Sequence, residues 1–153
     1  MGAHIGAGAE LQKGDGASPE NFVSVMGIKS ISGPGITRDA VETTDMSTEG
    51  WRTFIGGLKD GGEVSFEANF LPTDPTQNQT AGGFMAEFDK GSCDSKGNWR
   101  ILLPKCDGEP DSSWEFEGVV TGQEVEIPLE EVMGFNGTIK VSGRPELVIE
   151  QSP

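Results

Sequence analysis

The most regular pattern in the sequence is an alternation of apolar and polar residues over positions 63–71. One parity carries the apolar residues Val64, Phe66, Ala68 and Phe70, and the other carries the polar residues Glu63, Ser65, Glu67 and Asn69. Successive side chains of a β-strand point to opposite faces of the sheet. The segment is therefore predicted to be a strand with one buried face and one solvated face.

Shorter or less regular segments predict the remaining strands. They cover residues 11–13, 22–32, 36–44, 98–103, 114–127, 135–142 and 147–149. The strand at 22–32 changes parity near Gly27, which predicts a bulge. The strand at 36–44 is expected to pair back on it as a hairpin.

One short amphipathic helix is predicted by Phe84, Met85 and Phe88, and it is expected to end near Gly91. The chain contains 23 glycines among 153 residues, which favours strands and turns over long helices. The expected fold is therefore mainly β, a sandwich or barrel with one short flanking helix. A flexible N-terminal arm is expected over residues 1–10, followed by one β-domain over residues 11–153.

Residues 44–62 do not fit the strand pattern. Trp51, Phe54, Ile55 and Leu58 have the spacing of a helical face, but two glycines at 56 and 57 interrupt it. We expect a long, partly ordered loop that carries an apolar cluster. These four side chains are candidates for contacts between subunits, and the alternative is that they fill the core of their own domain.

The charge of the chain is strongly acidic, with 25 acidic and 11 basic residues and a formal net charge of −14. Duplex DNA carries about one negative charge per 1.7 Å, so it is repelled by such a surface and tight nucleic-acid binding is not expected. A role of the charge in solubility alone is the simpler alternative. No run of about 18 apolar residues occurs, and residues 1–9 do not resemble a secretory signal, so no membrane contact is expected.

The sequence offers little material for catalysis or metal binding. His4 is the only histidine, and Cys93 and Cys106 lie in no paired-cysteine motif, whereas a zinc site takes about four ligands. Common nucleophile, metalloprotease and phosphate-binding motifs are absent. The chain is predicted not to be an enzyme and to use no cofactor or metal. The two cysteines are expected to be free thiols, with a disulfide as the alternative.

Short motifs follow one another in order along the chain: SISGP at 30–34, TRD at 37–39, TTD at 43–45, GWRTFI at 50–55, GLKDGGEVSF at 57–66, GG at 82–83, WRI at 99–101, WEF at 114–116 and GTIKVSG at 137–143. This series resembles the lambda-like family of tail tube proteins of long-tailed bacteriophages. The resemblance covers roughly residues 11–149. The segments 89–98 and 105–111 are longer than is usual in the family.

The resemblance implies a structural protein of the virion, assembled in the cytoplasm of the host bacterium. Six copies would form a ring, rings would stack into a tail tube, and double-stranded DNA would pass through it on ejection. Tape-measure and tail-end proteins would be partners during assembly. The alternatives are the tube protein of a contractile tail or type VI secretion-like machine, and a β-sandwich binding module.

We predict where two sets of residues lie in such a ring. The polar parity of the clearest strand, Glu63, Ser65, Glu67 and Asn69, is expected to face the lumen. The cluster of Trp51, Phe54, Ile55 and Leu58 is expected to join neighbouring subunits.

Overall fold

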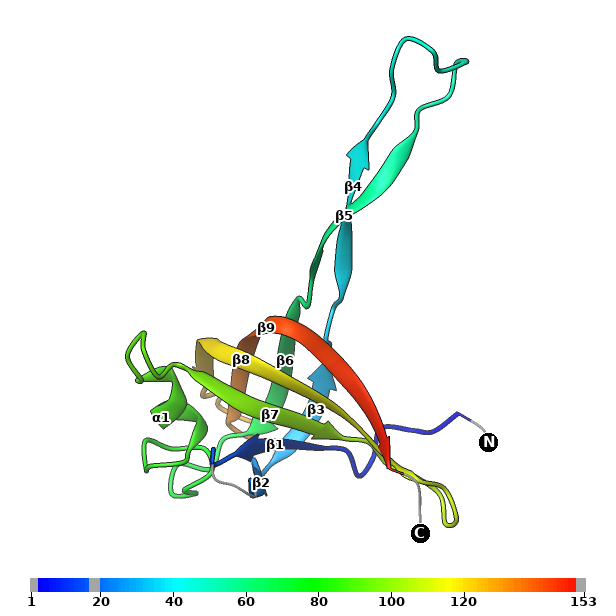
Figure 1. Cartoon of the computed structure of the whole chain (residues 1–153). Coiled ribbons are helices and arrows are strands. Elements are labelled where there is room, and N and C mark those ends of the chain that lie inside the picture. The colour runs from blue at the N-terminus through cyan, green and yellow to red at the C-terminus, as the bar shows by residue number, and fades with distance from the viewer. Residues whose placement is uncertain (1–2, 17–19, 151–153) are drawn as a thin grey trace.

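The computed structural model describes residues 3–16 and 20–150. Residues 1–2 of the expected arm and 151–153 of the expected β-domain lie outside this part of the chain. The main sheet is antiparallel, in the order β2-β1-β7-β8-β9-β6-β3. Its strands are β1 (Glu10–Gly14), β2 (Phe22–Ser24), β3 (Ile28–Ser32), β6 (Glu63–Asn69), β7 (Lys96–Leu102), β8 (Asp111–Glu126) and β9 (Gly134–Glu150). A second sheet consists of β4 (Thr37–Glu42) and β5 (Phe54–Asp60), and the helix α1 covers Phe84–Phe88 (Figure 1).

The main sheet is rolled into an incomplete barrel. Strands β2 and β3 form its two edges, yet only residues 25–27 separate them in the chain. The four steps from Ser24 to Ile28 span about 14 Å at most. The two edges therefore approach each other, and the mainly β, barrel-like fold with one flanking helix that we predicted is confirmed.

The inner face of the rolled sheet packs on α1. Phe84 of the helix is fully buried, and its ring meets Phe66 edge to face, with the ring centroids 4.9 Å apart. Phe135 and Trp99 surround the same ring. Gly137 leaves the space that these rings occupy, because a Cβ there would lie 2.5 Å from Phe84 Cζ and 2.6 Å from Phe66 Cε1.

A buried carboxylate holds the helix to the sheet. Glu87 of α1 is 3% exposed, and its Oε1 lies 2.6 Å from the Lys13 ammonium of β1 and 2.8 Å from that of Lys90. Removing one partner would leave a buried charge uncompensated, which is costly. With five residues, α1 is short, and no helix within the described residues is long and apolar enough to cross a membrane.

The single strand that we expected over residues 22–32 is two strands. β2 pairs with β1 and β3 pairs with β6, with a turn at Met26-Gly27 between them. Gly27 has a φ of +80°, and a side chain there would press on the Asn69 carbonyl. The buried amide of Gln77 closes this corner by donating to the carbonyl oxygens of Met26 and Asn69 at 2.7 and 2.9 Å.

The prediction that the strands at 22–32 and 36–44 form a hairpin is also wrong. The prediction of a loop over 44–62 is wrong in part. Strand β4 pairs with β5 instead, and β5 occupies residues 54–60 of that expected loop. The predicted strands at 135–142 and 147–149 are parts of one strand, β9. By contrast, the strand over 63–71 is confirmed as β6, where Val64, Phe66 and Ala68 are buried.

Candidate functional site

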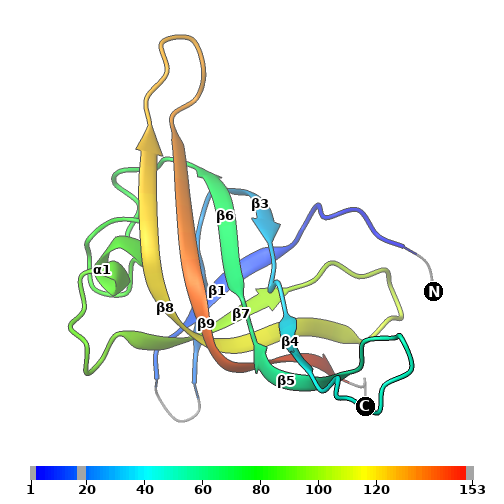
Figure 2. The same ribbon diagram turned by 90° about the horizontal axis from the view of Figure 1, so that it is seen from above.

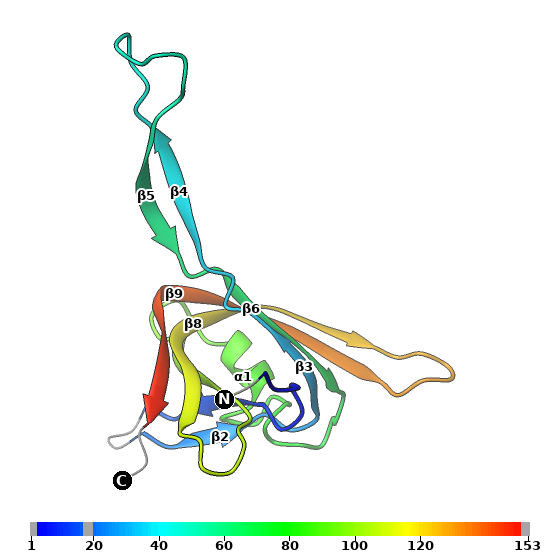
Figure 3. The ribbon, with the colours of Figure 1, turned by 90° about the vertical axis from the view of Figure 1, so that its right-hand side faces the viewer.

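The first candidate surface is the β4–β5 hairpin, residues 37–60, called here the projecting hairpin. It extends away from the rolled sheet as a narrow two-stranded ribbon (Figures 1 and 3). All its strand residues are exposed except Gly57, which is half-buried. Arg38 stabilises the ribbon by donating from Nε to the Gly57 carbonyl at 3.2 Å.

The projecting hairpin displays the apolar cluster that the sequence indicated. Trp51 is 83% exposed and Leu58 84%, while Phe54 and Ile55 are 54% and 60% exposed. The alternative that these four side chains fill the core of their own domain is therefore wrong. Their expected role between subunits remains a prediction.

The tip of the projecting hairpin is ordered by its own polar groups. The Thr43 amide donates to the Thr53 carbonyl at 2.8 Å. Asp45 accepts hydrogen bonds from the hydroxyl and the amide of Ser47, and these bonds hold the pKa of the Asp45 carboxyl below its ordinary value. The tip therefore presents Trp51 on a defined loop.

The base of the projecting hairpin is fastened to the main sheet. The Lys140 ammonium of β9 lies 2.7 Å from Asp60 Oδ1, which also accepts the Gly62 amide at 2.7 Å. Both contacts hold the pKa of Asp60 below its ordinary value, the hydrogen bond from Lys140 most of all. Gly62, with a φ of +73°, passes so close to Gly35 that a side chain would overlap it.

The second candidate surface is the outer face of β3, β6, β9 and β8, called here the polar face. Figure 2 shows these four strands side by side. Opposite residues of antiparallel strands share a face. One row across the strands is Ser30, Glu67, Asn136 and Glu124, and the next is Ser32, Ser65, Thr138 and Gly122.

The polar face carries the residues that the sequence placed on the solvated side of its clearest strand. Glu63 and Glu67 are exposed, and Ser65 and Asn69 are half-buried. Glu63 lies opposite Lys140, whose ammonium is paired with Asp60. The face therefore combines small polar side chains with carboxylates.

Sequence reasoning missed the contribution of the two long strands to the polar face. Asn136 and Thr138 of β9, with Glu124 and Glu126 of β8, extend it beyond β6. The signal was present, because Phe135 and Ile139 are buried on the opposite parity of β9. This alternation is a signal of the same kind as that of β6, and it locates the polar residues of β9.

A third cluster joins the N-terminal segment to the β7–β8 loop. His4 Nδ1 lies 3.7 Å from Cys106 Sγ, and His4 Nε2 lies 3.0 Å from Glu109 Oε2. One ligand atom from each of these three residues lies within 4.8 Å of the other two. The thiol and the carboxylate contact different nitrogens of the imidazole, so His4 links both groups of the loop to the N-terminal segment. Cys93 and Cys106 are both exposed and unpaired.

Comparison with known proteins agrees with this geometry. The family described as lambda phage tail tube protein, TTP, matches residues 10–148. None of the curated proteins matches the chain significantly. Among solved structures, the SPP1 tail tube is similar, with 12% identity and a TM-score of 0.64 over 98% of this chain and 80% of that one.

Two other solved structures share the fold. The tail of an empty gene transfer agent particle, computed with C6 symmetry, has 13% identity and a TM-score of 0.67 over 95% of this chain and 99% of that one. The sheath/tube terminator of an extracellular contractile injection system has 13% identity and a TM-score of 0.71 over 97% and 98%. The fold therefore occurs in both contractile and other tails, but the family match decides between them. The chain belongs to the lambda phage tail tube protein family, and it is a structural component of a phage tail rather than an enzyme.

Proposed function

We propose that six copies of this chain form a ring and that the rings stack into the tail tube. The projecting hairpin is the observation that carries this proposal. An isolated two-stranded hairpin is marginally stable in water, and this one exposes Trp51 and Leu58 at more than four-fifths of their surface. A second copy of the chain would bury these side chains and stabilise the ribbon.

The number six is supported by the fold shared with the gene transfer agent tail, whose structure has C6 symmetry. Ring closure would also cover the edge strands β2 and β3 of the incomplete barrel, since free edges invite unwanted pairing. The segment 3–9, which precedes β1, is proposed to contact the neighbouring ring.

The polar face is proposed to line the channel. Glu63, Ser65, Glu67 and Asn69 would then repeat six times around the bore, together with Glu124 and Asn136. Carboxylates repel DNA phosphates over about 8–10 Å before salt screens them. Double-stranded DNA would slide past such a wall during ejection, because Lys140, the basic side chain opposite Glu63, is already paired with Asp60.

The partners of the tube follow from the same role. We propose that the tape-measure protein occupies the channel while the tail is assembled in the host cytoplasm, and that tail-end proteins close the two ends of the tube. No membrane partner is included in this proposal.

Electron microscopy of the purified protein tests the central proposal. Rings with six-fold symmetry, or tubes made from them, are the expected result, and class averages give the symmetry directly. A protein that stays monomeric at every concentration and salt condition tested, while folded by circular dichroism, would refute self-assembly. Rings with another symmetry would refute the number six alone.

A further inference from the structure

A second exposed apolar surface lies at the turn between β8 and β9, residues 127–133, called here the ribbon tip. Ile127 is 75% exposed, Leu129 98% and Val132 70%. The segment 122–133 contains four glutamates, at positions 124, 126, 130 and 131, and no lysine or arginine. Figure 3 shows this turn projecting from the sheet in a direction different from that of the projecting hairpin. Exposed apolar patches of this kind mark interaction sites.

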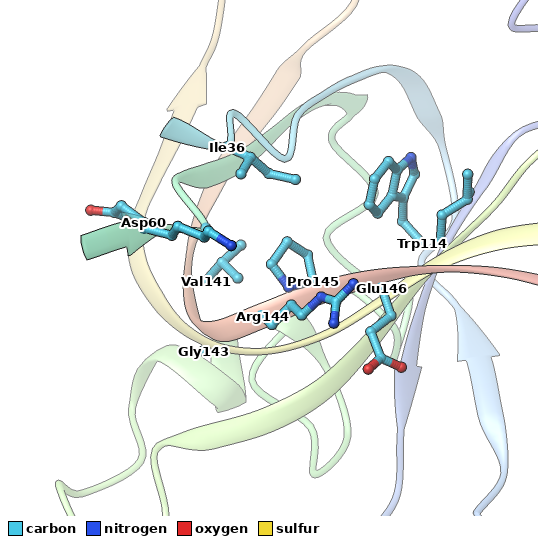
Figure 4. A pocket seen from close by; sticks show the side chains of 11 residues that line it. Ile36, Asp60, Trp114, Val141, Gly143, Arg144, Pro145 and Glu146 are labelled. Atoms are coloured by element: carbon cyan, nitrogen blue, oxygen red, sulfur yellow. The ribbon is translucent and has the colours of Figure 1, made fainter. Parts of the chain in front are cut away.

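A groove of about 790 Å³ lies farther along the same β8–β9 ribbon and is called here the ribbon groove. Its apolar lining comes from Ile36, Trp114, Val141, Pro145 and Leu147. Ile36, Trp114 and Pro145 surround one hollow, and Arg144 and Glu146 lie beside it on β9 (Figure 4).

The charges of the ribbon groove differ from those of the chain as a whole. Lys59 and Arg144 both line it, and no ion pair among residues 3–16 and 20–150 engages either side chain. Asp60 also lines the groove, but Lys140 neutralises it. Glu146 is the remaining acid. The groove is therefore an apolar surface with two unpaired cations and one unpaired carboxylate, on a protein of net charge −14.

We propose that the ribbon tip of one copy docks in the ribbon groove of a second copy, and this proposal rests on the proposed self-assembly. Ile127, Leu129 and Val132 enter the apolar hollow. Glu130 and Glu131 face Lys59 and Arg144 of the other copy. The apolar part supplies the free energy of burial, and the opposite charges set the register.

The position of the two surfaces makes this contact intermolecular. β9 leaves the ribbon tip at Gly134 and reaches the ribbon groove at Val141. Seven residues of strand separate them by about 23 Å, so a copy cannot dock its own tip. Two different surfaces in contact give a head-to-tail arrangement, which propagates until symmetry closes it. We assign the contact to the open case, in which it joins one ring of the proposed tube to the next.

The tip of the projecting hairpin is the rival occupant of the groove. It carries Arg52 beside Trp51, and its net charge is less negative than that of the ribbon tip. The base of the projecting hairpin already forms one wall of the groove, through Ile36, Lys59 and Asp60. The acidic ribbon tip therefore complements the two unpaired cations better.

Disulfide trapping tests the contact directly. In a Cys93→Ser/Cys106→Ser background, Leu129→Cys is combined with Ile36→Cys, and the purified protein is oxidised and run on a non-reducing gel. A ladder of linked copies is expected, whereas the control pair of Leu129→Cys with Asp94→Cys gives none. A ladder no stronger than that of the control overturns the docking, whether or not rings or tubes form. A ladder without six-fold rings would refute the hexamer and leave the docking in place.

Charge reversal tests the register. Glu130→Lys/Glu131→Lys and Lys59→Glu/Arg144→Glu should each lower the tube yield by about tenfold or more while rings persist, and all four changes together should restore tubes. The control, Asp94→Lys/Asp107→Lys, reverses two loop carboxylates elsewhere and should leave the yield unchanged. Normal tubes from either reversed variant, or no recovery in the combined one, would overturn the ionic pairing.

Discussion

The Lys140 ammonium lies 2.7 Å from Asp60 Oδ1, and this pair ties the base of the projecting hairpin to the centre of β9. The same carboxylate oxygen accepts the Gly62 amide in the tight turn that leads into β6. One side chain therefore fixes both the turn and the direction in which the projecting hairpin leaves the sheet.

Asp60→Asn should lower the thermal unfolding midpoint at neutral pH. The pKa of Asp60 is held below 3.8 by Lys140 and Gly62. Its stabilising contribution is therefore present above 3.8 and is lost as the pH falls through the lowered value. Wild type and Asp60→Asn should converge in strong acid. Asp39→Asn, on the same hairpin, is the control, and a gap that persists in strong acid would contradict the assignment.

Trp51→Ala should abolish tube formation and leave the monomer folded. An aromatic anchor in an interface commonly contributes about 2 kcal/mol or more, whereas a surface substitution changes the stability of a monomer by about 0.5 kcal/mol or less. Circular dichroism and electron microscopy of the same preparation measure both. Ile149→Ala, at an exposed apolar site near the end of β9, is the matched control. Tubes formed by Trp51→Ala at the wild-type yield would refute the interface role of this residue.

Glu67→Lys should permit tube assembly and slow DNA ejection. Six lysines around the bore would meet passing phosphates and release counter-ions on contact, so the effect should grow at low salt. The rate of ejection from phage that carry the substitution, at two salt concentrations, measures this. Asp94→Lys changes charge equally in an exposed loop and should eject normally. A cryo-electron map with Glu67 on the outside of the tube would end the proposal.

Gly137→Ala should destabilise the folded chain by about 1–3 kcal/mol, because the added methyl group meets the rings of Phe84 and Phe66 in a packed core. Gly122→Ala lies on the same ribbon, where the nearest atom to a new Cβ is 4.0 Å away, and it should be nearly neutral. Urea unfolding of both variants gives the comparison. Equal stabilities would mean that the aromatic cluster repacks freely.

Replacing both Cys93 and Cys106 with serine should leave phage yield unchanged. Both thiols are exposed and unpaired. The loss of the Cys106 thiol removes only the weak contact with His4 Nδ1. A loss of assembly that reducing agent reproduces in the wild type would instead reveal a structural disulfide.

The strand that the sequence predicted most clearly has its burial partners in the same chain. β6 could be predicted because Val64, Phe66 and Ala68 face a core that the chain itself supplies. β5 could not, because Phe54, Ile55 and Leu58 are exposed on a ribbon with no neighbour in the monomer. The ribbon tip was missed for a related reason, because its apolar residues follow no strand pattern and have no partner in the monomer.

The turn at Gly27 was not predicted, for a different reason. A change of parity is compatible with a bulge in one strand or with a turn between two strands. The choice depends on Gln77, fifty residues away in sequence, whose amide completes the turn. No local pattern contains that information.

The long β8–β9 ribbon has a mechanical consequence. Its hydrogen bonds run across the strands, while the covalent backbone runs along them. A pull along the ribbon, from its tip toward the opposite end, therefore loads the covalent backbones of both strands in parallel. A sideways pull opens the hydrogen bonds one at a time. A tail built from such ribbons, aligned end to end, would resist stretching strongly and still bend.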